Sequence, residues 1–331
     1  MTEAGNPPVV ALLEPGYADH AAERAAIAPL GLALLPVPAA ADAAAVLAGR
    51  EVRAILVRER RVDARLMDAC PGLRCVQRYG VGVDNVDLPA ATARRIAVCN
   101  IPDYGAAQEV SDHAVALYLA VARRIVSRDG EVRRGIWGVD QAQPVPGHRG
   151  AVLGLVGFGR IARAAWARFR ALGFARALVS DPALGAAEAA AHGVEPAPLE
   201  RIFAEADAVS LHAPLTAATR HIVDAAMLAR MKPTAVLVNA SRGGLIDEPA
   251  LAAALHEGRL FGAGIDVFET EPPAPDNPLL GAPNTVLTDH AGWYSEASVR
   301  ALQQHAAEGL RRALSGETPQ NWVNPWPEGG A

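Results

Sequence analysis

The sequence predicts an α/β fold made of two doubly wound parallel-sheet domains. The chain is 331 residues long, and at roughly 100–200 residues per domain this length accommodates two. Short apolar runs alternate with longer segments of helical period, which is typical of parallel sheets with helices on both faces. The alternation runs from residue 9 to about residue 100 and starts again at residue 151, which indicates two separate sheets.

The first series contains five predicted strands, at residues 9–13, 32–37, 54–57, 74–79 and 96–100. An Ala-rich segment near residues 18–28 is predicted to be a helix between the first two strands. Residues 108–127 are mostly apolar and contain neither Gly nor Pro, which predicts one long helix. Because this helix is apolar on all sides, we expect it to be buried against a second subunit, and we predict a homodimer through it.

The second series begins at AVLGLVGFG, residues 151–159, and its further predicted strands are residues 177–180, 208–212, 235–240 and 262–267. A final helix is expected over about residues 296–314, where the polar and apolar residues again follow a helical period. The Pro-rich tail, residues 318–327, is predicted to be extended because proline excludes both helix interiors and central strands.

Composition and charge exclude several classes of function. Lys and Arg total 31 against 36 Asp and Glu, so a net charge of −5 offers no basic field for nucleic acid or an anionic membrane. Cys70, Cys75 and Cys99 lack the spacing of a metal site or a disulfide framework, and we expect ordinary buried thiols and no metal. The start of the chain lacks the basic region of a signal peptide, so we expect a cytoplasmic protein.

A glycine-rich turn follows the first predicted strand of the second series. Gly157 permits the tight turn, and Gly159 lets a pyrophosphate approach the N-terminus of the next helix. Ala162 supplies the small side chain that the third position of the motif needs. Asp181 ends the following strand, where a carboxylate accepts hydrogen bonds from ribose hydroxyls and repels a 2′-phosphate, which favours NAD over NADP. Arg160 has two interpretations, as a ligand of a 2′-phosphate or as a phosphate or solvent contact in the loop.

A second constellation consists of Arg242, Glu271 and His290, each of which follows the carboxyl end of a predicted strand. These side chains suit the reduction of a 2-keto acid. A guanidinium binds carboxylate and keto oxygens in a forked geometry, and an imidazolium delivers a proton to the carbonyl oxygen. A neighbouring carboxylate orients the imidazole and favours its charged form. Each residue alone also has an ordinary structural interpretation. Arg242 can be a donor that braces its loop, Glu271 a surface acid, and His290 a hydrogen-bonded loop histidine.

The motifs RYGVGVDNVDLPAA, IAVCNIPDY, GFGRIA, LHAPLTAATRHIV, VNASRGGLIDEPAL, GIDVFETEPP and HAGWYSE span nearly the whole chain. With them the sequence resembles the D-isomer-specific 2-hydroxyacid dehydrogenase family, and within it the C-terminal-binding-protein and phosphoglycerate-dehydrogenase-like branch. The resemblance implies a Rossmann NAD-binding domain, residues 103–295, inserted in a flavodoxin-like substrate domain, residues 1–102 and 296–331. Asp289 is a difference from the pattern, because family members usually have proline directly before the histidine.

The resemblance also implies roles for individual residues. Arg242 matches the substrate-binding catalytic arginine, Glu271 the acid paired with the histidine, and His290 the proton donor. The implied substrate-binding residues are Arg78, Val81, Gly82 and Trp293. The implied cofactor-binding residues are Gly157, Phe158, Gly159, Arg160, Ile161, Asp181, His212, Ala213, Pro214, Thr216, Ala240, Ser241 and Asp266.

Two classes of function fit these residues. The first is an NAD-dependent dehydrogenase that interconverts a 2-keto acid and a D-2-hydroxy acid. The second is an NAD(H)-sensing dimeric regulatory protein with incidental dehydrogenase activity. The intact set of Arg242, Glu271 and His290 favours the enzyme. Trp293 favours an apolar, aromatic or thioether substrate side chain, and phosphohydroxypyruvate is disfavoured because Arg78 is the one cation noted near the substrate loops.

Overall fold

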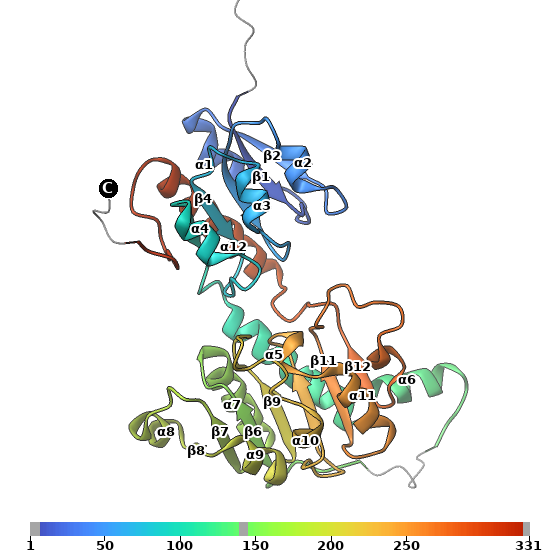
Figure 1. Cartoon of the computed structure of the whole chain (residues 1–331). Helices are drawn as coiled ribbons and strands as arrows, with labels where there is room; N and C mark the ends of the chain where they lie inside the picture. The colour runs from blue at the N-terminus through green and yellow to red at the C-terminus, as the bar shows by residue number, and fades with distance from the viewer. Residues whose placement is uncertain (1–6, 139–144, 327–331) are drawn as a thin grey trace, which may run out of the picture. The chain divides into compact units, whose positions relative to one another are not determined.

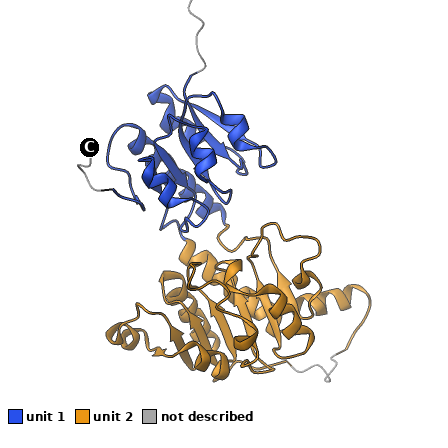
Figure 2. Ribbon diagram, in the orientation of Figure 1, with its two compact units in different colours: residues 1–105, 295–331 blue, residues 106–294 orange. Residues whose placement is uncertain are grey.

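The computed structural model describes residues 7–138 and 145–326. The chain divides into two compact units, which Figure 2 shows in different colours. Unit 1 consists of Met1–Gly105 and Ser295–Ala331, and unit 2 consists of Ala106–Tyr294. Each unit is built around one fully parallel sheet, so the predicted fold class, two doubly wound α/β domains, is confirmed.

The sheet of unit 1 has the order β2-β1-β3-β4-β5. Its strands are β1 Val9–Leu13, β2 Ala33–Val37, β3 Val52–Val57, β4 Cys75–Arg78 and β5 Ala97–Cys99. Its helices are α1 Ala21–Ile27, the short 3-10 helix η1 Ala28–Leu30, α2 Ala43–Leu47, α3 Ala64–Asp68, α4 Leu88–Ala93 and α12 Glu296–Leu314. The chain reverses its direction across the sheet between β1 and β3, which is where open α/β sheets bind ligands.

The two ends of the chain meet in unit 1. Helix α12 packs against α1 and β4, and the side-chain amide of Gln303 donates to the carbonyl of Asp19 at 2.7 Å. The tail then runs antiparallel to β5, where the backbone N–H of Val323 donates to the carbonyl of Val98 at 2.9 Å. The described part of the tail turns at residues 320–321 and pairs with β5 at one bridge, so the expectation of an extended tail holds only around Trp322.

The sheet of unit 2 has the order β12-β11-β10-β9-β6-β7-β8. Its strands are β6 Val152–Val156, β7 Arg176–Ser180, β8 Glu195–Pro196, β9 Ala208–Leu211, β10 Val236–Asn239, β11 Gly262–Ile265 and β12 Thr285–Leu287. Its helices are α5 Ala106–Ala122, α6 Ile125–Arg133, α7 Arg160–Leu172, α8 Ala186–His192, α9 Leu199–Glu205, α10 Ala225–Leu228 and α11 Glu248–His256, with the 3-10 helices η2 Gly243–Leu245 and η3 Pro278–Gly281. Strands β6 to β11 have the spatial order of a dinucleotide-binding fold, and β12 is added at one edge of the sheet.

Two core layers flank this sheet (Figure 1). One layer contains Leu117 and Tyr118 of α5 together with Phe169 of α7. The other contains Ile202 and Phe203 of α9 and Leu251 of α11. The sheet is therefore covered on both faces, so the loops at its carboxyl edge are the part of it that remains accessible to a ligand.

The expectation of one helix over residues 108–127 is wrong. The structure has two helices, α5 and α6, separated at Arg124, whose φ of 55° lies in the left-handed region. The apolar side of α5 packs against the sheet of its own unit, so its hydrophobicity does not require a second subunit. Helix α6 buries none of its residues. Within the described ranges, none of the helices combines the length and apolarity needed to cross a membrane.

Candidate active site

The glycine-rich turn joins β6 to α7 at the switch point between β6 and β9. Gly157 has a φ of 88°, and a Cβ there would lie 2.7 Å from the backbone nitrogen of Ala213, so both conformation and space require glycine. A Cβ at Gly159 would meet no atom within 4 Å, which leaves open space in front of the α7 N-terminus. Ala162 is fully buried. This arrangement fits a pyrophosphate held by helix N–H groups.

Asp181 follows β7 and lies beside the glycine-rich turn. Its Oδ2 accepts the backbone N–H of Phe158 at 2.6 Å, and its Oδ1 accepts that of Ala183 at 2.8 Å. The carboxylate is thus fixed at the carboxyl edge. Arg160 is exposed at the start of α7, and Ile161 next to it is half-buried.

The loops after β9 and β10 also meet. Ser241 Oγ donates to the carbonyl of Ala213 at 2.8 Å. His212 Nε2 lies 2.9 Å from Ser210 Oγ, and burial lowers the pKa of His212 to about 4, so this histidine is neutral at physiological pH. Ala240 is half-buried, and Pro214 and Thr216 are exposed on the loop after β9. The residues implied for cofactor binding in these loops therefore share one edge of the sheet.

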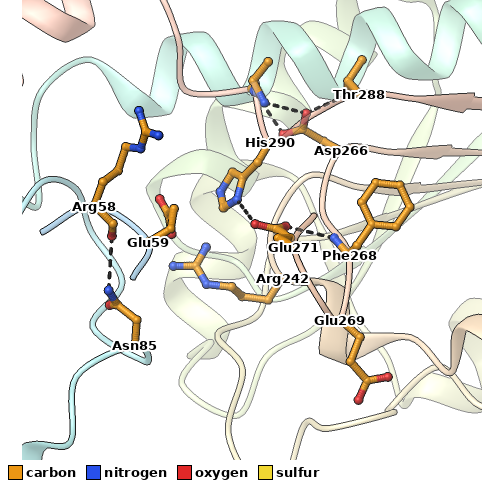
Figure 3. Close-up of polar contacts among 12 residues, drawn as sticks. Arg58, Glu59, Asn85, Arg242, Asp266, Phe268, Glu269, Glu271, Thr288 and His290 are labelled. Atoms are coloured by element: carbon orange, nitrogen blue, oxygen red, sulfur yellow. Dashed lines mark hydrogen bonds and ion pairs between the residues drawn. The ribbon is translucent and has the colours of Figure 1, made fainter. Parts of the chain in front are cut away.

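His290 and Glu271 form a close pair in unit 2 (Figure 3). His290 Nδ1 lies 2.7 Å from Glu271 Oε2, and Glu271 Oε1 accepts the backbone N–H of Phe268 at 3.0 Å. Burial raises the pKa of Glu271, but the hydrogen bond and charge of His290, the Phe268 N–H and the charge of Arg242 together hold it below its ordinary value. Glu271 is therefore a carboxylate that orients the imidazole.

Arg242 follows β10, and Figure 3 shows its guanidinium close to the pair of His290 and Glu271. Its Nη1 donates to the carbonyl of Ser241 at 2.8 Å. Residues of three different strand ends thus converge: Arg242 after β10, Glu271 after β11 and His290 after β12. This convergence combines a cation for an anionic ligand with an acid–base pair that can move a proton.

Asp266 lies directly after β11 and is 1% exposed. Its carboxylate accepts hydrogen bonds from the Thr288 hydroxyl and from the backbone N–H groups of Ala291 and Gly292. His113 of α5 lies 3.2 Å from the same carboxylate. Sequence patterns indicate neither Thr288 nor His113, because neither belongs to a motif with a recognisable spacing.

The residues of unit 1 for which the resemblance implies substrate binding lie at the end of β4 and directly after it. Arg78 is 5% exposed, and its Nη2 donates to both carboxylate oxygens of Glu59 at 3.0 and 3.1 Å. Its guanidinium lies against the backbone of Gly80, where a Cβ would meet Arg78 Nη1. Val81 is exposed and Gly82 is half-buried. No sequence motif marks Glu59, so the pairing of the Arg78 charge is visible only in the structure.

Trp293 belongs to unit 2, three residues after His290. Its ring is half-buried and meets the ring of Tyr294 edge-on, with 5.7 Å between centroids. The aromatic pair therefore adjoins the turn that carries His290. Within residues 7–138 and 145–326, no group of three or more His, Cys, Asp or Glu side chains is arranged to hold a metal ion.

Comparison with known proteins identifies the family. Residues 115–292 match the family model described as "D-isomer specific 2-hydroxyacid dehydrogenase, NAD binding domain". Over 266 residues the chain is 43% identical to a glyoxylate reductase of Korarchaeum cryptofilum, which covers 80% of each protein. Over 277 residues it is 40% identical to a D-3-phosphoglycerate dehydrogenase of Mycobacterium leprae, which covers 83% of this chain and 51% of that protein. The chain thus spans about half the length of that second relative.

Among solved structures, the TT0316 protein of Thermus thermophilus is similar over 95% of this chain and 99% of that one. The TM-score is 0.81 at 34% sequence identity. The strand order of unit 2 agrees with this match, because it is the order of a dinucleotide-binding fold and the matched family domain binds NAD. The chain belongs to the D-isomer-specific 2-hydroxyacid dehydrogenase family, in its phosphoglycerate-dehydrogenase-like branch, and its cofactor is NAD(H).

Proposed function

We propose that the protein interconverts a 2-keto acid and a D-2-hydroxy acid, with His290 as the proton donor in reduction and the acceptor in oxidation. The observation that carries this proposal is the 2.7 Å contact between His290 Nδ1 and Glu271 Oε2. NADH, when bound, supplies the hydride that reduces the keto carbon. The residues proposed to hold it are those of the glycine-rich turn, Asp181, the loops after β9 and β10, and Asp266.

Glu271 has two effects on His290. Accepting the Nδ1–H fixes the tautomer, so that Nε2 is the nitrogen that exchanges a proton with substrate. Because the pKa of Glu271 is lowered, the carboxylate is charged at neutral pH, and this charge favours the imidazolium. In reduction the imidazolium gives its Nε2 proton to the keto oxygen, and in oxidation the neutral ring takes the proton of the hydroxyl.

Arg242 is the proposed ligand of the substrate carboxylate and keto oxygen. Its Nη1 donates to the carbonyl of Ser241. A planar guanidinium matches the geometry of a carboxylate. Both relatives reported above have names that specify acids with oxygen on the carbon next to the carboxylate, which supports this substrate class. The backbone N–H groups of Val81 and Gly82 are proposed to bind the substrate carboxylate as well, and Trp293 to line the pocket of the substrate side chain. Arg78, which pairs with Glu59, is proposed to face the substrate.

We also propose that Asp181 makes NAD the preferred cofactor over NADP. The carboxylate is fixed by the Phe158 and Ala183 N–H groups, so it cannot easily turn away from a 2′-phosphate. Self-association is proposed through the end of the 108–127 segment, where α6 begins at Ile125, and through the residues that follow up to residue 138. Five of the eight exposed large hydrophobic residues in the described ranges lie there, namely Ile125, Val126, Val132, Ile136 and Trp137.

The activity test is NADH oxidation with a panel of 2-keto acids that includes glyoxylate, pyruvate, phenylpyruvate and 3-phosphohydroxypyruvate. We expect turnover with at least one, and we expect kcat for reduction to fall as pH rises, because reduction needs protonated His290. Tight NADH binding without turnover would instead support the NAD(H)-sensing regulatory protein. Light scattering should show a dimer at micromolar concentration, and Trp137→Asp should shift it toward the monomer; a wild-type monomer would refute self-association.

A further inference from the structure

The turn that carries His290 is held by one buried carboxylate, that of Asp266 (Figure 3). The main-chain carbonyl of Asp266 accepts the N–H of His290 at 2.8 Å. Its side chain accepts the N–H of Ala291 at 2.9 Å and the N–H of Gly292 at 3.0 Å. Three consecutive backbone donors therefore converge on a single residue at the end of β11.

This turn has a backbone conformation that needs such support. His290 has a φ of 57°, in the left-handed region, where a residue with a Cβ is disfavoured by about 1–2 kcal/mol. A Cβ at Gly292 would lie 2.9 Å from Asp266 Oδ2 and 3.3 Å from the His113 ring, so the backbone approaches closely there. The conformation that aims His290 at Glu271 depends on contacts from outside the turn.

Two side chains fix the Asp266 carboxylate. Thr288 Oγ1 donates to Asp266 Oδ1 at 2.6 Å, and His113 Nε2 lies 3.0 Å from Thr288 Oγ1 and 3.2 Å from Asp266 Oδ1. Since the Thr288 hydroxyl donates to the carboxylate, the network assigns the proton to His113 Nε2. Burial raises the pKa of Asp266, but the bonds from His113 and Thr288, the charge of His113 and the Gly292 N–H lower it to about 2. The carboxylate is therefore charged at neutral pH.

The network joins α5 to the catalytic turn. His113 stands on α5, which packs against β10 and β11, and its side chain is 23% exposed. Thr288 follows β12 and is two residues from His290. A packed helix and two strand ends thus meet at one carboxylate, so a change at His113 or Thr288 is transmitted to His290 through Asp266.

We propose that Thr288 and His113 are positioning residues of the reaction: they fix the Asp266 carboxylate, which sets the left-handed turn of His290 and its contact with Glu271. This inference rests on the proposed role of His290 as proton donor. Neither residue is assigned a contact with substrate or cofactor. Asp266 itself is unsuited to the test because the family resemblance also implies that it binds the cofactor.

The experiment compares Thr288→Val, which removes the hydroxyl at nearly constant volume, with Thr288→Ser, which keeps it. We expect Thr288→Val to lower kcat for reduction about 10- to 100-fold, the range expected when a reacting group is displaced by about 1 Å. The pH profile of kcat should shift with it, while KM for NADH changes less than about 3-fold. Thr288→Ser should restore kcat to within about 3-fold and restore the wild-type pH profile.

His113→Leu is the second variant and decides the question if Thr288→Val does not fold. It should reduce kcat and shift the pH profile in the same direction. The matched control is His256→Leu, an exposed histidine on α11 of the same unit, which should match the wild type. Unchanged kcat and pH profile in both Thr288→Val and His113→Leu would overturn the inference, as would equal losses in Thr288→Ser and Thr288→Val.

His290→Asn is measured in parallel so that the two proposals can fail separately. If His290→Asn is inactive and Thr288→Val equals the wild type, the positioning role is overturned and the proposed function stands. If His290→Asn keeps wild-type turnover, the proton-donor role fails, and with it the positioning inference. Circular dichroism melting of each variant distinguishes a loss of kcat from a loss of folded protein.

Discussion

The two parallel sheets place very different chemistry at their carboxyl edges. In unit 2, the edge combines glycine-lined space before α7, a hydrogen-bonded acid–base pair and the nearby guanidinium of Arg242. In unit 1, the carboxylates at the switch point accept hydrogen bonds from the unit itself. Glu59 binds Arg78, and Glu14 Oε2 accepts the backbone N–H groups of Glu59 and Arg60 at 3.0 and 2.7 Å.

This difference separates the chemistry that each sheet can offer at its carboxyl edge. The edge of unit 2 has groups whose protonation can change and space that a dinucleotide fits. At the edge of unit 1, the carboxylates of Glu59 and Glu14 already accept hydrogen bonds from Arg78 and from backbone N–H groups. Both edges follow the same topological rule, yet only the edge of unit 2 supplies the proposed proton donor.

The largest effect is expected at the acid–base pair of unit 2. His290→Asn keeps a polar side chain but removes the proton donor, so kcat should fall by about 100- to 10,000-fold. Binding of NADH, followed by its fluorescence, should change little because His290 is not proposed to hold the cofactor. Steady-state kinetics at saturating NADH measures the loss, and the exposed His256→Asn variant is the control. Wild-type turnover in His290→Asn would refute the contrast between the two edges.

Asp266 provides the next effect, in stability. Its pKa of about 2 lies below the ordinary value of 3.8, so the charged form contributes about 2 kcal/mol of stability above pH 4, and this is lost as pH falls toward 2. Asp266→Asn should therefore unfold more easily at pH 7, and the deficit relative to the wild type should narrow by pH 3. Calorimetry at both pH values measures the difference. A deficit that is the same at pH 7 and pH 3 would contradict this account.

A smaller effect is expected at Asp181. Asp181→Ala removes the carboxylate that repels a 2′-phosphate, so the ratio of NADPH to NADH binding constants should rise about 10-fold. Fluorescence titration with each cofactor gives the ratio. Asp276→Ala, at an exposed acid of the same unit, should leave it unchanged. If the ratio is unaltered in Asp181→Ala, another group sets the cofactor preference.

The smallest effect tests the charge balance of unit 1. Glu59→Gln leaves the cation of Arg78 without a counter-charge, so KM for 3-phosphohydroxypyruvate should fall about 5-fold relative to KM for pyruvate, as about 1 kcal/mol allows. Glu51→Gln, at an acid of the same unit that pairs with Arg53, is the control. A KM ratio that does not move in Glu59→Gln would mean that Arg78 does not sense the substrate.

The fold class could be predicted because short apolar runs alternate with segments of helical period along the chain. Runs such as Val9–Leu13 and Val152–Val156 are buried along their length and read as strands without any tertiary information. The break at Arg124 could not be predicted, because neither Gly nor Pro marks it and arginine in the left-handed region is held there by its surroundings. Strands β8 and β12 are not among the predicted strands, and the two exposed residues of β8 do not form an apolar run.

The candidate site likewise has a part that the sequence predicts and a part that only the structure shows. The rule that loops at carboxyl ends of parallel strands converge is sufficient to bring Arg242, Glu271 and His290 into one hypothesis. Contacts between residues that are distant in sequence and lie outside motifs have no recognisable sequence pattern. His113 and Thr288 are 175 positions apart, so their pairing depends on the packing of α5. Arg78 ends β4 and Glu59 follows β3, 19 positions earlier, so their pairing depends on sheet order.

The return of α12 to unit 1 has a consequence for synthesis on the ribosome. Gln303 and Asp19 are 284 positions apart, so unit 1 acquires the helix that covers α1 and β4 only after all of unit 2 has been made. Unit 2 is continuous in sequence and can form its core first. Until α12 is synthesised, the apolar surface of α1 and β4 that α12 covers stays exposed. Nascent chains released before residue 296 should accordingly bind holding chaperones through their N-terminal segment, although their dinucleotide-binding sheet is complete.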